Sequence, residues 1–268
     1  MPVGVVDRDN RPVTSLERKN FRIFENKVEQ PISSFLMDDE PLAVGLVFDT
    51  SGSMGRSGND LRRSRMAARA FFEAANPEDE FLLVECTTRA ALTVPLTSDA
   101  RRIEDRLAVT ESKGKTALLD AIYLGLTEIK KSKKSRKALL VLSDGGDNNS
   151  RYTQCELVNF ARESDVSIYV MGIFAPAEFL GPEDFGPKLL NSIAQQTGGR
   201  EYSGDFAKLP EIARRIGVEL RNRYVLGFSP ANLERDGRYH DVQIKIVGTR
   251  GVPETFTSWR RGYYAPAD

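Results

Sequence analysis

Short apolar runs alternate with longer amphipathic segments through the middle of the chain. The apolar runs are near-continuous, which is typical of strands buried on both faces of a parallel sheet. They are PLAVGLVFD (41–49), EFLLVEC (80–86), KALLVLSD (137–144) and VSIYVMGIF (166–174). Segments between them, such as LLDAIYLGLTEIKK (118–131), place apolar residues on one helical face. The alternation from about residue 40 to 220 predicts an α/β fold with a doubly wound, mostly parallel sheet.

The segment AALTVPL (90–96) departs from this alternation. It follows the run at 80–86 too closely to leave room for a helical crossover. We therefore expect an antiparallel edge strand that pairs with that run through a hairpin.

The two ends of the chain favour short strands instead. Residues 1–38 contain short apolar segments separated by turn-forming residues, and Val242, Ile244 and Ile246 alternate with polar neighbours near the carboxyl end. Neither end has enough apolar residues to bury a sheet alone. We predict that residues 1–38 and 222–268 pair as a small β-sandwich into which a domain of residues 39–221 is inserted.

Charge and composition narrow the possible partners. The 268 residues include 38 basic and 38 acidic ones, so no overall field attracts nucleic acid or an anionic membrane. The basic run KKSKKSRK (130–137) is interpreted as a solvated helix end. No apolar stretch approaches the ~18–20 residues of a membrane span. We therefore expect a protein partner, no nucleic acid and no transmembrane segment in this sequence. Cys86 and Cys155 are expected to remain unpaired.

Oxygen-bearing residues interrupt the apolar pattern where two of the predicted strands end. Asp49 ends the first run and is followed by Ser51 and Ser53, while Asp144 ends the third. Thr116 lies just before a predicted helix. If the two strands are central neighbours, these side chains converge on a solvated crevice at the carboxyl end of the sheet. Such hard oxygen donors suit Mg²⁺, Mn²⁺ or Ca²⁺ and disfavour zinc.

Three motifs together resemble a known family. DTSGSM (49–54), the threonine of GKTALLDA (114–121) and LSDGGD (142–147) are similar to the metal-ion-dependent adhesion site of von Willebrand factor A (VWA) domains. The resemblance covers about residues 40–220 and implies a non-enzymatic module for adhesion or scaffolding. The flanking segments also resemble a bacterial group of VWFA-related proteins, many of them exported. This implies a periplasmic or extracellular location with an export signal outside this sequence, and a cytoplasmic location is the alternative.

The resemblance also implies a role for each site residue. Ser51, Ser53 and Thr116 would contact the cation directly, and Asp49 and Asp144 would act through bound water or as alternate ligands. An Asp or Glu carboxylate of a partner protein would fill the remaining position.

Simpler interpretations exist for several of these residues. Asp49 and the two serines are also common in helix-capping turns, and Thr116 alone is typical of a helix amino-terminal cap. Asp147 is a candidate for a partner-binding rim, although an ordinary exposed loop carboxylate is the simpler interpretation. Asp120 is expected to complement a helix dipole and to bind no metal. His240 is expected at the surface, and Trp259 in the sandwich core or at its edge.

An enzymatic alternative is a metal-dependent phosphatase with Asp49 as its nucleophile. Phosphatases of the haloacid dehalogenase type place Asp-x-Asp at such a strand end, whereas this chain has Asp-x-Ser. The second carboxylate, which would protonate the leaving group, is therefore missing. A phosphate-binding GxxxxGK[ST] loop is also missing from the sequence.

Overall fold

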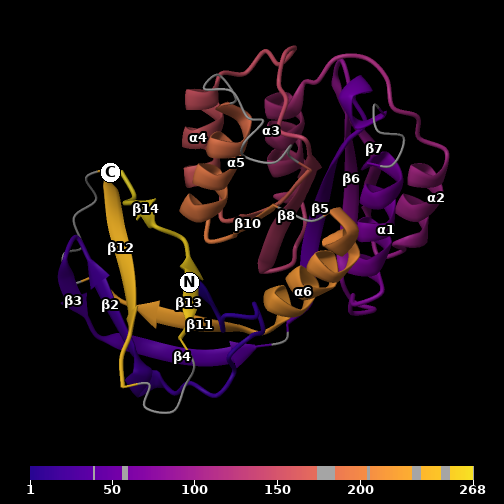
Figure 1. The fold of residues 1–268 in the computed structure, drawn as a ribbon. Helices are drawn as coiled ribbons and strands as arrows, with labels where there is room; N and C mark the ends of the chain where they lie inside the picture. Colours follow the sequence, from indigo (N-terminus) through magenta and orange to yellow (C-terminus); the bar gives the residue numbers. More distant parts are fainter. Residues whose placement is uncertain are drawn as a thin grey trace.

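A computed structural model describes residues 1–38, 40–55, 60–173, 185–203, 206–230, 237–248 and 254–267. In this part of the chain one six-stranded sheet forms the centre of an α/β unit, and two four-stranded sheets lie beside it (Figure 1). The predicted α/β fold with a mostly parallel sheet and flanking antiparallel sheets is confirmed.

The central sheet has the strand order β10-β9-β8-β5-β6-β7. Its pairings are parallel except for the last, where β7 runs antiparallel to β6 at the edge of the sheet, as the sequence predicted. The strands are β5 (Leu42–Asp49), β6 (Glu80–Cys86), β7 (Ala90–Thr97), β8 (Arg136–Ser143), β9 (Ser167–Gly172) and β10 (Glu201–Ser203).

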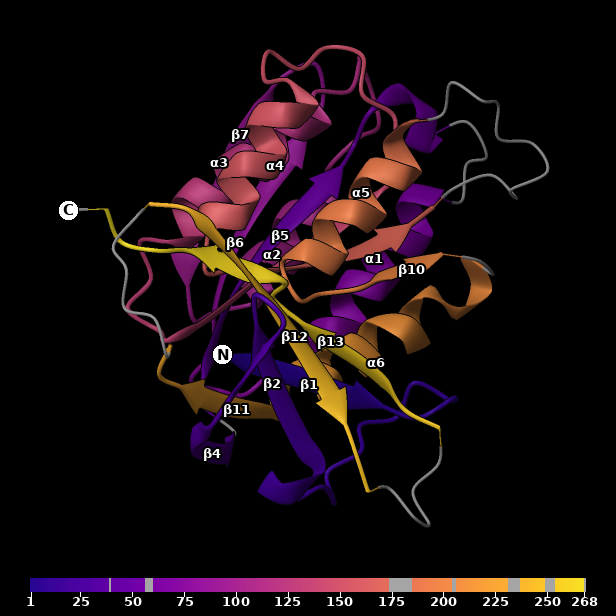
Figure 2. The ribbon, with the colours of Figure 1, turned by 90° about the vertical axis from the view of Figure 1, so that its left-hand side faces the viewer.

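Helices cover both faces of this sheet (Figures 1 and 2). Helices α1, α2 and α6 bury apolar residues on one face, and α3, α4 and α5 do so on the other. Their bounds are α1 (Asp60–Phe72), α2 (Arg101–Ala108), α3 (Leu118–Ile129), α4 (Gln154–Glu163), α5 (Phe185–Gln196) and α6 (Leu209–Arg221). None of the helices within the described ranges is long and apolar enough to span a membrane.

A close approach of α3 to β5 fixes the helix that follows the predicted threonine. A methyl group added at Gly125 would lie 3.1 Å from Cγ2 of Val47 and 3.2 Å from Cδ2 of Leu139. Glycine therefore lets the helix pack directly on the two central strands. Because α3 is held in this way, the loop before it lies at the carboxyl end of β5.

The two outer sheets are built from both ends of the chain (Figure 2). One has the order β13-β1-β11-β4 and the other β14-β12-β2-β3. The predicted pairing of residues 1–38 with the carboxyl-terminal strands is confirmed, since β1 pairs with β11 and β13, β4 with β11, and β2 with β12. The strands are β1 (Pro2–Val6), β2 (Phe21–Glu25), β3 (Val28–Gln30), β4 (Ile32–Asp38), β11 (Arg223–Phe228), β12 (Tyr239–Ile246), β13 (Phe256–Trp259) and β14 (Gly262–Tyr264).

A separate apolar core lies between these two sheets, and Trp259 belongs to it as predicted. The division into units 1–38, 39–221 and 222–268 stays a prediction. The predicted surface position of His240 is wrong: the residue is 7% exposed, and its Nδ1 lies 3.0 Å from Oε1 of Glu25. His240 shares the inward parity of Val242 and Ile244 on β12, which explains its burial. Cys86 is buried and Cys155 exposed, and both are free thiols, as expected.

Candidate functional site

The two predicted carboxylates lie at the ends of adjacent strands. β5 ends at Asp49, and Asp144 directly follows β8. β5 and β8 pair in parallel from Leu42 to Phe48 of β5, so their carboxyl ends meet at one edge of the sheet. Burial raises the pKa of Asp49, and the charge of Asp144 adds to that rise. The expectation that the two strands are central neighbours is confirmed.

Asp49 is completely buried, which corrects the expectation that it lies in a solvated crevice. All residues of β5 are buried, including this last one. Its Oδ1 accepts a 2.9 Å hydrogen bond from the amide of Ser51, and its Oδ2 accepts a 2.6 Å bond from the hydroxyl of Ser143. Burial raises the pKa of Asp49 to about 6, and the Ser143 hydrogen bond opposes that rise. Asp144, in contrast, is partly exposed.

The two serines after β5 present their hydroxyls side by side. The Oγ atoms of Ser51 and Ser53 are 2.9 Å apart. Ser51 is buried and Ser53 partly exposed, and a short 3-10 turn at Gly52–Gly55 (η2) carries the chain away from the strand. The Asp-x-Ser-x-Ser spacing therefore places two neutral oxygen donors next to a buried carboxylate.

The loop that precedes α3 is hydrogen-bonded to the loop that carries the serines. The amide of Lys113 donates to the carbonyl of Thr50 at 2.9 Å, and the amide of Gly52 donates to the carbonyl of Gly114 at 3.0 Å. The hydroxyl of Ser112 also donates to the carbonyl of Ser51. These bonds bring the segment containing the predicted threonine alongside the first motif.

Thr116 is in turn held by the loop after β8. It is 3% exposed, and its amide donates to Oδ1 of Asn148 at 3.0 Å. Its carbonyl accepts from the amides of Asn148 and Asn149, each at 3.0 Å. The backbone of Thr116 is therefore linked to the residues that directly follow the third motif, and Asp147 of that motif accepts from the amide of Leu118, so the three motifs are joined in one hydrogen-bonded unit. Thr116 is not the side-chain cap of α3, because the N-cap position is Ala117.

Two further carboxylates near the site have hydrogen-bonding roles. Oδ1 of the exposed Asp147 accepts from the amide of Leu118 at 2.8 Å and from the hydroxyl of Ser150 at 2.6 Å, so this residue caps α3 from another loop. Oδ1 of Asp120 accepts from the amides of Arg151 and Tyr152 at 2.8 and 3.0 Å. The rim role of Asp147 toward a partner stays a prediction.

Sequence reasoning missed the residues that hold the site together. Ser143 immediately precedes Asp144 in the quoted motif, and Asn148 follows Asp147. The signal for Ser143 was available, because a polar residue that ends a buried strand next to a carboxylate needs a hydrogen-bond partner. The contact of Asn148 with Thr116 joins residues 32 positions apart, and no local sequence pattern predicts it.

The oxygen donors at the strand ends suit a hard divalent cation. Within the described ranges no group of three or more His, Cys, Asp or Glu side chains is placed to hold a metal ion. The oxygens gathered here are instead serine hydroxyls beside two carboxylates; burial raises the pKa of Asp49, and repulsion by Asp144 adds to that rise. A hard divalent cation fits such donors and would relieve this repulsion.

The doubly wound sheet, with hydroxyl and carboxylate residues at the ends of its central strands, defines a class of α/β domain that matches a known family. Residues 44–146 match the model of the von Willebrand factor type A domain. This match over residues 44–146 confirms the resemblance to VWA domains that the sequence motifs predicted. An uncharacterized protein of Borreliella burgdorferi is 27% identical over 213 residues, which are 67% of this chain and 62% of that protein.

Solved structures of low sequence identity share the fold. A von Willebrand factor type A protein from Catenulispora acidiphila has a TM-score of 0.60 at 15% identity, covering 91% of this chain and 62% of its own. An aerotolerance-related membrane protein from Bacteroides fragilis has a TM-score of 0.54 at 17% identity, covering 67% and 98%. The vWF domain of the type V pili tip protein Mfa5 from Porphyromonas gingivalis has a TM-score of 0.56 at 13% identity, covering 67% and 94%.

Proposed function

We propose that this protein is a non-enzymatic binding module that captures an acidic residue of a partner protein through a divalent cation. VWA domains are typically protein-interaction modules, which supports the general class. The observation that carries the specific proposal is the convergence of Asp49 and Asp144 on adjacent strands, beside serine hydroxyls that lie 2.9 Å apart.

The residues of the site have distinct roles in this proposal. Ser51, Ser53 and Thr116 supply neutral oxygens to the cation, while Asp49 and Asp144 supply negative charge, directly or through water. Mg²⁺ suits this set, and Mn²⁺ or Ca²⁺ are alternatives. When bound, the cation would supply the positive charge that a partner's carboxylate recognises. Because the protein donors are mostly neutral, we expect cation and partner to tighten each other's binding by the same factor.

The position of Asp49 supports binding over phosphatase chemistry. A nucleophilic carboxylate must reach its substrate, whereas Asp49 is fully buried and both its oxygens accept hydrogen bonds. We therefore expect no hydrolysis of p-nitrophenyl phosphate above background with Mg²⁺ or Mn²⁺. Turnover that is abolished in Asp49→Asn would contradict the non-enzymatic proposal.

We also propose that the protein is exported. The support is indirect: similar folds include a membrane protein and a pilus tip protein. Fractionation of cells that express the full-length gene tests this point, and recovery in the cytoplasm alone would contradict it.

Calorimetric titration with Mg²⁺ tests the cation site itself. We expect saturable binding by the wild type and loss of binding in Ser51→Ala and Thr116→Val. A matched control is Thr127→Val on α3, whose hydroxyl is exposed and donates to the carbonyl of Tyr123. Equal Mg²⁺ binding by all four proteins would show that the ion is held elsewhere.

A further inference from the structure

A cavity of about 480 Å³ lies at the end of the central sheet opposite to Asp49. It is lined by the beginnings of β5, β8 and β9 on one side, at Leu42, Ala138 and Ser167. The sandwich strand β11 contributes Arg223 and Val225. The volume falls within the range of about 300–1,000 Å³ that is usual for small-molecule sites.

The walls combine apolar side chains with several cations. Apolar contributions come from both units, for example Val166 of the α/β unit and Phe228 of the sandwich. The cationic side chains in the lining are Arg136, Lys137, Arg223 and Arg260, and the anionic ones are Glu40 and Asp165. The lining therefore carries an excess of positive charge.

Arg223 is the buried cation of this lining, whereas Arg136, Lys137 and Arg260 are partly exposed. Arg223 is 2% exposed. Nη1 donates to the hydroxyl of Ser167 at 2.9 Å and Nη2 to the carbonyl of Gly198, and both acceptors are uncharged. Nε is buried and has no hydrogen-bond partner in the described part of the chain. Among the described residues no carboxylate forms an ion pair with it. Burying a charge without a paired counter-charge is energetically unfavourable. The buried guanidinium of Arg223 would therefore be stabilised by an anionic ligand.

The neighbouring acidic groups are already engaged with other residues. Asp165 lies 3.3 Å from Arg260, within ion-pair distance. Glu219, which is 1% exposed, lies 3.4 Å from Arg200 and accepts hydrogen bonds from the hydroxyls of Tyr169 and Tyr202. Glu219 is thus shared among several donors, and neither carboxylate lies within ion-pair distance of Arg223.

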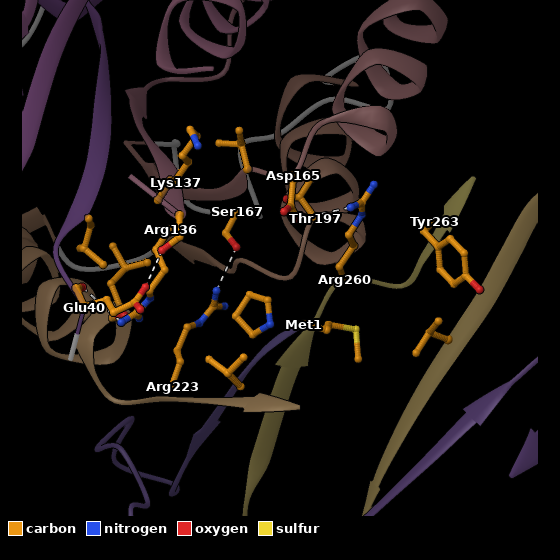
Figure 3. Close-up of a pocket in the computed structure, with 18 of the residues that line it drawn as sticks. Met1, Glu40, Arg136, Lys137, Asp165, Ser167, Thr197, Arg223, Arg260 and Tyr263 are labelled. Atoms are coloured by element: carbon orange, nitrogen blue, oxygen red, sulfur yellow. Dashed lines mark hydrogen bonds and ion pairs between the residues drawn. The ribbon is translucent and has the colours of Figure 1, made fainter. Parts of the chain in front are cut away.

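The close-up in Figure 3 shows how the lining side chains surround the cavity. Arg223 rises from β11 toward Ser167 on β9, and Arg260 and Tyr263 approach from the segment around β14. We propose that this cavity binds a small carboxylate with an apolar body, the carboxylate lying beside Arg223 and the apolar body against the aliphatic and aromatic walls.

The chemistry of the wall favours a monoanion of this kind. The guanidinium has five N–H groups; after the bonds to Ser167 and Gly198, Nη1 and Nη2 each keep one N–H group that suits a carboxylate. The single buried guanidinium of Arg223 matches the single charge of a carboxylate. The largely apolar surroundings disfavour a heavily hydrated phosphate, because its remaining oxygens would lose water without gaining partners.

Calorimetric titration with octanoate tests the proposal, with octan-1-ol as the uncharged ligand of matched length. We expect saturable octanoate binding that is at least about tenfold tighter than octanol binding, because the alcohol lacks the negative charge and the second acceptor oxygen of the carboxylate. Arg223→Gln should weaken octanoate binding at least about tenfold. The control Arg69→Gln, whose side chain is 71% exposed on α1, should bind like the wild type.

A second variant distinguishes loss of the binding site from a folding defect, which could also explain weak binding by Arg223→Gln. Val225→Phe adds bulk at the cavity wall and should abolish octanoate binding while circular dichroism and Mg²⁺ binding remain those of the wild type. The proposal is overturned if octanoate does not bind, if octanol binds as tightly, or if a folded Arg223→Gln or Val225→Phe retains full octanoate affinity.

Discussion

The hydroxyl of Ser143 on β8 donates a 2.6 Å hydrogen bond to Oδ2 of Asp49 on β5, so a buried, charge-assisted contact joins the ends of two neighbouring strands. The same hydroxyl accepts from the amide of Gly145 at 3.0 Å, which fixes the start of the loop that carries Asp144. Ser143 thus positions both carboxylates of the proposed cation site.

Replacement of Ser143 by alanine should therefore destabilise the fold and weaken cation binding together. We expect the free energy of unfolding to fall by about 1.5–3 kcal/mol, the usual size for a hydrogen bond to a charged group. Urea denaturation and Mg²⁺ titration measure the two effects. Ser33→Ala, at an exposed position on β4, is the control and should change neither. Wild-type stability in Ser143→Ala would contradict the structural role.

The raised pKa of Asp49 predicts how stability changes with pH in the absence of a cation. The folded protein holds this proton up to about pH 6, whereas the unfolded chain releases it near 3.8. This group therefore stabilises the fold most below about pH 4, and that stabilisation is lost as the pH rises through 6. The difference between the two pKa values corresponds to about 3 kcal/mol.

Urea denaturation with EDTA between pH 4 and 7.5 checks this expectation, with Asp49→Asn as the reference. Subtracting the variant's free energies of unfolding from those of the wild type removes the contributions of the other groups. We expect the free energy of unfolding of the wild type to fall, relative to that of the variant, by up to about 3 kcal/mol as the pH rises. A difference independent of pH would show that Asp49 is ionised throughout.

Protons should also compete with the cation for Asp49. Because the carboxylate must be ionised to contribute its charge, Mg²⁺ affinity should fall as the pH drops below about 6. In Asp49→Asn the affinity should be low at every pH. Calorimetric titrations at several pH values measure this, and a pH-independent wild-type affinity would exclude Asp49 from the site.

The capping role of Asp147 leads to a different prediction. Asp147→Ala leaves the amide of Leu118 without its acceptor, so we expect a loss of about 1 kcal/mol in the free energy of unfolding. Asp147→Asn keeps an acceptor oxygen and should retain most of that stability. Mg²⁺ affinity should fall less in either variant than in Asp49→Asn. The cap is not important if alanine and asparagine behave alike in denaturation.

The arrangement of units predicts that a fragment of residues 39–221 folds by itself. Its two apolar cores lie on the faces of the central sheet and contain no residue of the outer strands. We expect a cooperative unfolding transition and wild-type Mg²⁺ affinity for this fragment. A fragment that fails to fold would show that the sandwich is an integral part of the domain.

Much of the fold could be predicted because its strands are simple to recognise. Runs buried on both faces, such as the one that forms β5, leave little choice except a parallel sheet covered by helices. The burial of His240 was not predicted, although its parity with Val242 and Ile244 indicates it. The prediction followed the polar character of the imidazole, whereas the alternation along β12 places this side chain inward.

The candidate site was predicted only in part for a physical reason. Motifs at strand ends identify Asp49, Ser51 and Asp144, because those positions depend on local sequence. The contact of Thr116 with Asn148 depends on how distant segments pack, and so does the position of Arg223 between the central sheet and the outer strands. Such contacts arise from the tertiary structure, and no hydrophobic periodicity of the sequence predicts them.

Selection of peptide ligands in the presence of Mg²⁺ tests the central claim most directly, because the claim couples cation, site and acidic partner in one binding event. Displayed peptides that bind the wild type would be measured again with EDTA, with Asp49→Asn, and with their Asp and Glu residues changed to Asn and Gln. The proposal predicts that each of the three changes abolishes binding. Peptides that bind equally well after all three changes would contradict cation-dependent capture of a carboxylate.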